Sequence, residues 1–192
     1  MSLFFDIGQG AGLAGATGVR PFLPPLAAGA LASGDIGLDF DNSGWQFLES
    51  PAFLLAVLML AVLAYAAERS TVNPRAVSVA TGTLALVLGA LLFAGSMAAG
   101  HGSPVIGVVA GIACAALAYL SIGGLLERAS KRLDDSAAGF VVVYADVAAL
   151  VLAAVAIFLP PAAFLVLVAF AVLLVRGRAD GDRKYAGLRI LR

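Results

Sequence analysis

The sequence predicts an all-α polytopic membrane protein, and its composition carries that prediction. Of its 192 residues, 61% are hydrophobic and only 12% are charged, and the mean hydropathy is +1.01. Soluble domains are roughly 45–50% apolar and about 25% charged. One domain of this size could not hide so much apolar surface from water. The lipid bilayer is therefore the expected solvent and partner of most of the chain.

Six apolar segments account for the predicted helices. A helix needs about 20 residues to cross the roughly 30 Å hydrocarbon core. The segments cover residues 8–32, 51–68, 76–99, 104–126, 138–159 and 161–176. We therefore expect a six-helix transmembrane domain over residues 1–176, followed by a basic cytoplasmic tail over residues 177–192.

Prolines mark several of the helix starts. A polar capping residue followed by proline, which fits the first helical position without loss of a hydrogen bond, begins three of the segments. These pairs are Ser50-Pro51, Asn73-Pro74 and Ser103-Pro104. The pair Pro160-Pro161 predicts a tight turn between the last two segments.

The basic residues predict the orientation. Eleven of the twelve lie at 69–75, at 128–132 or beyond residue 175, whereas residues 33–50 and 100–103 hold none. With six crossings all eleven lie on one side, and the positive-inside rule makes that side cytoplasmic. The prediction is a multi-pass protein of the bacterial inner membrane with both termini in the cytoplasm.

A weak internal repeat accompanies this topology. The segment 65–69, ending in Glu68-Arg69, resembles the segment 125–128, ending in Glu127-Arg128. Both end spans that point the same way, so a duplication would be parallel. A chance match in Ala- and Leu-rich sequence is an equal alternative. These two Glu-Arg pairs are otherwise expected to be cytoplasmic interfacial anchors.

The first segment is interrupted by a cluster of prolines next to an arginine. Pro21, Pro24 and Pro25 follow Arg20 within five positions, and proline removes backbone donors and breaks the helical ladder. A broken helix at membrane depth is tolerated where it is buried in protein or lines a wet cavity. One interpretation is a substrate or ion path through this stretch, with Thr17 just before it. The other is a structural charge that holds a kinked helix in register.

Asp146 is the acidic residue that lies well inside a later span. A carboxylate in lipid protonates or pairs with a cation, and the available intramembrane cation is Arg20. The sequence therefore predicts a salt bridge between the first and fifth spans, with proton coupling through Asp146 as the alternative.

Glycines at helical spacing predict close helix packing. Residues 10–15 formally match GxGxxG, but no strand precedes them, so we exclude dinucleotide binding. Small residues three or four apart let membrane helices approach closely. The residues expected to pack in this way are Gly8, Gly12, Gly15, Gly107 and Gly111.

Several functions are excluded by what the chain contains. A net charge of zero argues against a nucleic-acid binder. The single cysteine, Cys114, and the single histidine, His101, argue against a metal, haem or other cofactor site. No nucleophile–base pair or paired catalytic carboxylates are visible, so we expect no enzyme.

The Gly-rich first segment, the stretch from Gly18 to Pro24, Glu68, Asp146 and the tail 184–189 together resemble domain-of-unknown-function family 4126 of bacterial inner-membrane proteins. The resemblance covers nearly the whole chain. It implies a polytopic fold and no particular activity.

Two functions follow as expectations. The first is a small transporter or channel-like protein for a small solute or ion, in monomeric or homo-oligomeric form, with its path at the broken first helix. The second is a non-transporting membrane scaffold or accessory subunit whose glycine faces bind partner helices or lipid.

Overall fold

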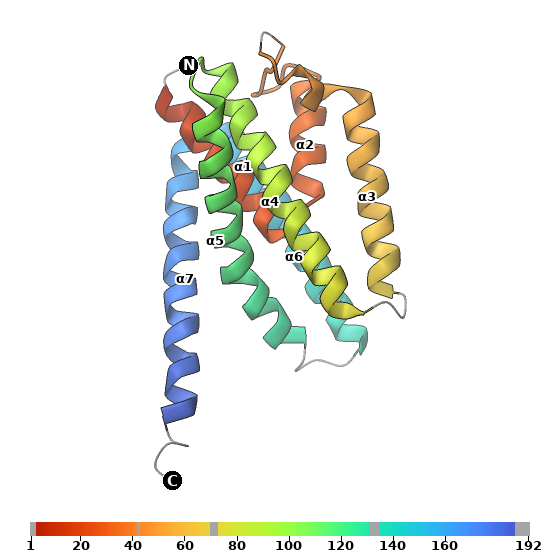
Figure 1. The fold of residues 1–192 in the computed structure, drawn as a ribbon, viewed down its shortest axis with the longest axis vertical. Helices are drawn as coiled ribbons and strands as arrows, with labels where there is room; N and C mark the ends of the chain where they lie inside the picture. Colours follow the sequence, from red (N-terminus) through yellow and green to blue (C-terminus); the bar gives the residue numbers. More distant parts are fainter. Residues whose placement is uncertain (1–2, 42, 70–72, 131–134, 187–192) are drawn as a thin grey trace.

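The computed structural model describes residues 3–41, 43–69, 73–130 and 135–186, and within these ranges all regular secondary structure is helical (Figure 1). The elements are α1 (Leu3–Val19), α2 (Leu23–Ala32), the 3-10 helix η1 (Gln46–Glu49), α3 (Pro51–Arg69), α4 (Pro74–Ala99), α5 (Pro104–Ser130), α6 (Asp135–Phe158) and α7 (Pro160–Ala186).

Five helices in the described part of the chain, α3 to α7, are long and apolar enough to cross a membrane. They run alternately up and down the bundle (Figure 1). One end carries the acidic segment 33–50, and we name it the acidic end. The opposite end, where α4 begins next to Arg75 and α7 passes Arg176, is named the basic end.

The first predicted span is two helices and not one, and the prediction of six crossings is not confirmed in the described part of the chain. α1 starts at the acidic end, where Asp6 lies against Gly100 at the end of α4. It descends to mid-bundle, where Arg20 contacts Asp146 of α6. α2 then returns to the acidic end, where Gly29 lies against Leu48 (Figure 1). α1 and α2 therefore form a re-entrant hairpin.

The prediction that both termini share one side is not confirmed, because the first and last described helices reach opposite ends of the bundle. α1 begins at the acidic end, and α7 continues past residue 176 to Ala186 at the basic end (Figure 1). The basic residues could not reveal this, because Arg20 is the only one before Arg69. The end of α3 and the end of α5 lie on the same side in either topology. Residues 187–192, the end of the predicted tail, lie outside the described residues, and the parallel repeat stays a prediction.

The turn between α1 and α2 follows from its sequence. α1 ends at Val19 and α2 begins at Leu23. Pro21 has no N–H to bond with the carbonyl four residues earlier, so the ladder cannot continue through it. Pro24 and Pro25 lie in the first turn of α2, where missing N–H groups need no partner.

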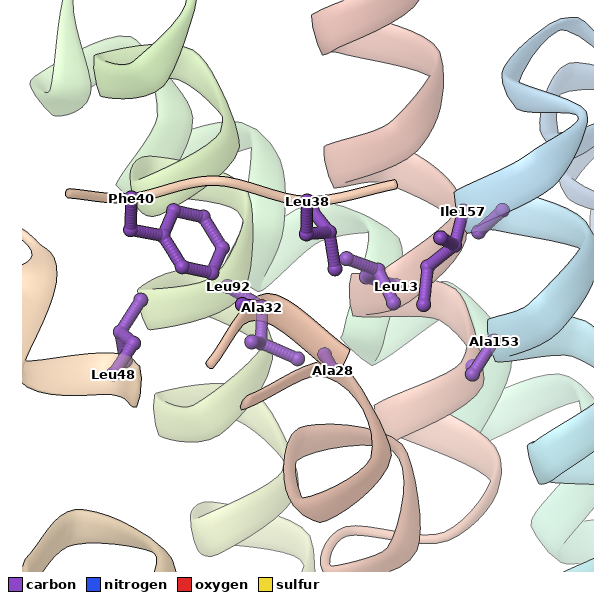
Figure 2. Close-up of a cluster of buried hydrophobic side chains, with 11 residues drawn as sticks. Leu13, Ala28, Ala32, Leu38, Phe40, Leu48, Leu92, Ala153 and Ile157 are labelled. Carbon is purple, nitrogen blue, oxygen red and sulfur yellow. The ribbon is translucent and has the colours of Figure 1, made fainter. Parts of the chain in front are cut away.

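The hairpin forms the centre of the bundle. α1 contacts α4, α5, α6 and α7, and every residue from Gly8 to Gly18 is buried. Towards the acidic end, the connecting segment covers the hairpin: Leu38 and Phe40 point into an apolar cluster with Leu13 and Leu48 (Figure 2). Outer helices are in contrast largely exposed, as α3 shows with 6% of its span buried.

Glycines make the central position of α1 possible. A Cβ atom on Gly8 would lie 2.6 Å from the carbonyl oxygen of Pro160, and one on Gly12 would lie 2.5 Å from Cβ of Ala156. Gly107 and Gly111 allow the same approach of α5 to α4, with backbone atoms of α4 2.7 Å from each added Cβ. Gly15 is different, because a Cβ there meets side chains only at 3.6 Å.

Candidate functional site

The tip of the hairpin delivers Arg20 to the middle of α6. Nε of Arg20 lies 2.6 Å from Oδ1 of Asp146, and the side chains are 19% and 18% exposed. Nη2 of Arg20 also donates to the carbonyl oxygen of Val142 at 3.4 Å. The ion pair predicted from the sequence is confirmed. It compensates two charges that are each costly in lipid.

A third helix contributes to the same carboxylate. The phenol of Tyr65, in the second half of α3, donates to Oδ2 of Asp146 at 2.8 Å. Both oxygens of Asp146 are therefore engaged, one with the hairpin turn and one with α3. Asp146 thus links three segments at one point: α6, the hairpin turn and α3. Hydrogen bonds to a carboxylate are shorter and stronger than those between neutral groups.

A cavity of about 460 Å³ lies next to this ion pair. Its walls come from the hairpin turn and from the basic-end halves of α3, α4 and α5. The lining residues that carry charge or hydroxyl groups are Arg20, Tyr65, Glu68, Ser78, Thr81, Tyr119 and Asp146. The cavity extends from mid-bundle to Glu68, which is exposed and next to the last residue of α3.

Hydroxyl groups order the wall formed by α4 and α5. The phenol of Tyr119 lies 3.1 Å from the hydroxyl of Ser78 and donates to the Ser78 carbonyl at 3.1 Å. Its ring rests on Gly82, where an added Cβ would lie 3.0 Å from Cζ. Thr81 bonds back to the carbonyl of Val77 at 2.9 Å. Glycine at position 82 thus leaves room for the phenol end of Tyr119 to lie against α4.

The structure divides the predicted path residues into two groups. Arg20, Pro21 and Asp146 line the cavity, together with Glu68, which the sequence indicated only as an anchor. Thr17 is fully buried and bonds to the carbonyl of Leu13 at 2.8 Å. Pro24 and Pro25 are also buried. Thr17, Pro24 and Pro25 do not line the cavity.

Sequence reasoning missed the tyrosines. Tyr65 and Tyr119 each interrupt an Ala- and Leu-rich span with a hydroxyl group, which was an available signal. The signal is ambiguous, because phenols at span ends also serve as interfacial residues. The side chains of the predicted anchors Arg69, Glu127 and Arg128 lie outside the described residues.

The acidic end carries a separate polar surface. Asp35, Asp39 and Asp41 are exposed, with their carboxylates within 4.8 Å of one another. Glu49 accepts a hydrogen bond from the backbone N–H of Phe40 at 2.5 Å. Burial raises the pKa of Glu49, and the three aspartates add to the rise, whereas the Phe40 bond opposes it.

These features define a polytopic helical membrane protein with a central re-entrant hairpin and, at the hairpin tip, a cavity lined by apolar, charged and hydroxyl-bearing side chains. The chain belongs to the family described as Domain of unknown function (DUF4126), whose model matches residues 7–179. No curated protein and no solved structure matches the chain.

Proposed function

We propose that the protein is a small transporter or channel-like protein for a small solute or ion, and that the cavity at the hairpin tip is the binding part of its path. The observation that carries the proposal is the position of this cavity. It lies beside a charged network of Arg20, Asp146 and Tyr65 at mid-bundle. Pockets of 300–1,000 Å³ with a few convergent polar groups are typical of small-molecule sites.

The free-energy cost of placing a helix break and an ion pair inside the bundle supports a solute path. Non-helical backbone and ionised side chains at membrane depth are expensive, and they persist where they line a cavity or a solute route. At its acidic-end half the hairpin is held mainly by an apolar cluster with Leu13, Leu38 and Phe40. The partly buried ion pair of Arg20 with Asp146 occurs at the tip, where the cavity lies.

The proposal also assigns an orientation. The basic end faces the cytoplasm of a bacterium and the acidic end faces outward, as the positive-inside rule requires. The cavity then reaches the cytoplasmic side at Glu68, while the hairpin and the apolar cluster around Phe40 separate it from the outside. This arrangement corresponds to one state of a transporter that opens to one side at a time.

The scaffold alternative is less well supported. That alternative requires glycine faces that are free to bind partner helices. Gly8, Gly12 and Gly107 instead pack against Pro160, Ala156 and Ala94 of the chain itself. The proposal accordingly assigns the protein a transport role without a catalytic step.

The test is side-specific labelling of a single cysteine. In a Cys114→Ser background, Thr81→Cys places a thiol on the cavity wall, and Ala153→Cys places one in the apolar cluster as a matched buried control. The reagent is a charged, membrane-impermeant methanethiosulfonate, added to proteoliposomes on one side at a time. We expect it to modify Thr81→Cys from the basic end and, more slowly, from the acidic end. Ala153→Cys should not be modified from either end. Modification of Thr81→Cys from the basic end alone, under every condition tried, would overturn a transmembrane path.

A further inference from the structure

We infer that the cavity binds an organic cation of drug-like size, an ammonium or phosphonium centre carried on apolar groups. This inference rests on the proposed function for the claim that such a solute is moved, but binding itself is tested separately below. Four properties of the cavity carry it: its charge, its aromatic residues, its apolar walls and its size.

The positive charge of Arg20 is already neutralised by the carboxylate of Asp146. Nε pairs with Asp146 at 2.6 Å, and Nη2 faces the Val142 carbonyl. An anionic solute would have to displace the Asp146 carboxylate from a partner that it already contacts in a partly buried site. Opening such a pair leaves a carboxylate without its counter-charge, which is strongly unfavourable.

A negative charge remains at the cavity. Glu68 lines it, and no ion pair involving Glu68 occurs within the described residues. Among the described residues, the charged lining groups are thus one arginine and two carboxylates, with a formal net charge of −1. A solute cation would neutralise this charge without disturbing the Arg20–Asp146 pair.

Aromatic side chains contribute from three segments. Phe22 comes from the hairpin turn, Tyr65 from α3 and Tyr119 from α5, and all three line the cavity. Aromatic rings attract cations through the negative face of the π system, an effect that grows when the cation is desolvated. The chain thus combines a carboxylate with several rings, which is the combination that suits quaternary ammonium groups.

The remaining walls favour apolar substituents. Ala61 and Ala64 from α3 and Val77 and Ala85 from α4 form much of the lining. These small side chains leave the volume of about 460 Å³ open, which is within the range of drug-sized ligands.

The experiment compares two probes of nearly equal shape and opposite charge. The full chain in nanodiscs of zwitterionic lipid is titrated with radiolabelled tetraphenylphosphonium and, separately, tetraphenylborate, with empty nanodiscs as the partition blank. We expect saturable binding of tetraphenylphosphonium and only partition-level uptake of tetraphenylborate. Glu68→Gln should weaken phosphonium binding at least about tenfold, because at an effective dielectric constant near 20 the loss of a charge partner about 12 Å away already corresponds to a factor of ten.

Matched variants isolate each contribution. Asp35→Asn removes one negative charge at the opposite end and tolerates its positive φ of 55°, so it should bind as the unmodified chain does. Tyr119→Phe keeps a ring and loses the bond to Ser78, whereas Tyr119→Leu loses the ring as well. We expect Tyr119→Leu to bind tetraphenylphosphonium more weakly than Tyr119→Phe does. The two variants should have equal thermal stability, so that the difference reports the loss of the ring.

The outcomes separate this inference from the proposed function. Saturable tetraphenylborate binding that equals phosphonium binding, or unchanged phosphonium affinity in Glu68→Gln, would overturn the organic-cation assignment. Flux of an anion or neutral solute through proteoliposomes would then leave the transport proposal standing. Phosphonium binding that depends on Glu68, without phosphonium flux in either direction, would keep the binding site and refute transport of that cation.

Discussion

Tyr65 and Asp146 meet across the cavity, with the Tyr65 phenol donating to Oδ2 of Asp146 at 2.8 Å. The bond joins the second half of α3 to α6. The first half of α3 is fixed differently, because Val57 is buried against Phe22 and Leu88. The bond of Tyr65 therefore adds a polar contact to the part of α3 that forms a wall of the cavity, where Ala61 and Ala64 also pack against the Val57 cluster.

Tyr65→Phe tests this role. The variant keeps the ring and removes the hydrogen bond, and we expect a loss of about 0.5–1.5 kcal/mol of stability. Amide hydrogen exchange should become faster over residues 60–69 and stay unchanged over residues 51–57. Equal protection in both halves would show that other contacts hold this part of α3.

The Arg20–Asp146 pair is tested by a double-mutant cycle. Each side chain is less than one-fifth exposed, so removing one leaves the other as an uncompensated charge, at a cost of up to about 3 kcal/mol. Arg20→Ala and Asp146→Ala should each lower the unfolding temperature in detergent. The double variant should recover part of the loss, with a coupling of about 0.5–3 kcal/mol. Strict additivity would contradict a direct pair.

Two glycines on one helix offer a matched test of packing. An added Cβ at Gly12 would lie 2.5 Å from Cβ of Ala156, whereas at Gly15 it would lie 3.6 Å from the nearest side chains. Gly12→Ala should therefore destabilise by about 1–3 kcal/mol through overpacking. Gly15→Ala should be neutral or stabilising by up to about 1 kcal/mol, because alanine favours the helix. Thermal unfolding of the two variants measures the difference, and equal values would refute the packing of α1.

The re-entrant hairpin is tested by labelling three positions in intact cells. With Cys114 replaced by Ser, an impermeant maleimide should reach Leu3→Cys and Ser43→Cys from outside and leave Arg75→Cys protected. A six-crossing chain would instead place Leu3→Cys with Arg75→Cys. The three thiols are compared after permeabilisation, which should make all of them reactive.

Glu49 should make stability depend on pH. Burial raises the pKa of Glu49 from its ordinary value of 4.5, so the folded state binds a proton more tightly than the unfolded state. Stability should fall as pH rises from 4.5 through the raised pKa and then level off. Glu49→Gln keeps an oxygen for the Phe40 N–H and should lose this contribution, so the difference between the two pH profiles of unfolding measures it.

Much of the fold could be predicted because lipid imposes a simple rule on sequence. Apolar length and Pro-marked starts located α3 to α6 closely, since each span must satisfy its own backbone hydrogen bonds. The hairpin could not be recognised in the same way. Residues 8–32 have enough apolar length to cross, and length alone does not distinguish one crossing from a descent and a return.

The site was predictable only in part, for a similar reason. Arg20 and Asp146 could be paired because each is costly alone in lipid. Tyr65, Ser78 and Tyr119 carry no such cost as neutral groups, so nothing in the sequence linked them to the charged pair. Their grouping depends on how α3, α4 and α5 pack, which periodicity in uniformly apolar helices does not encode.

The order in which the chain is synthesised adds a consequence of the hairpin. Arg20 contacts Val142, 122 residues later in the chain, so its partners leave the ribosome long after α1 and α2. Until α6 has inserted, Arg20 lacks the Asp146 carboxylate, so the hairpin tip is costly at membrane depth. We therefore expect the hairpin to take its final place only after α6 has inserted, although it is synthesised first. Truncation before α6 should leave the first 32 residues accessible to protease, whereas truncation after α6 should protect them.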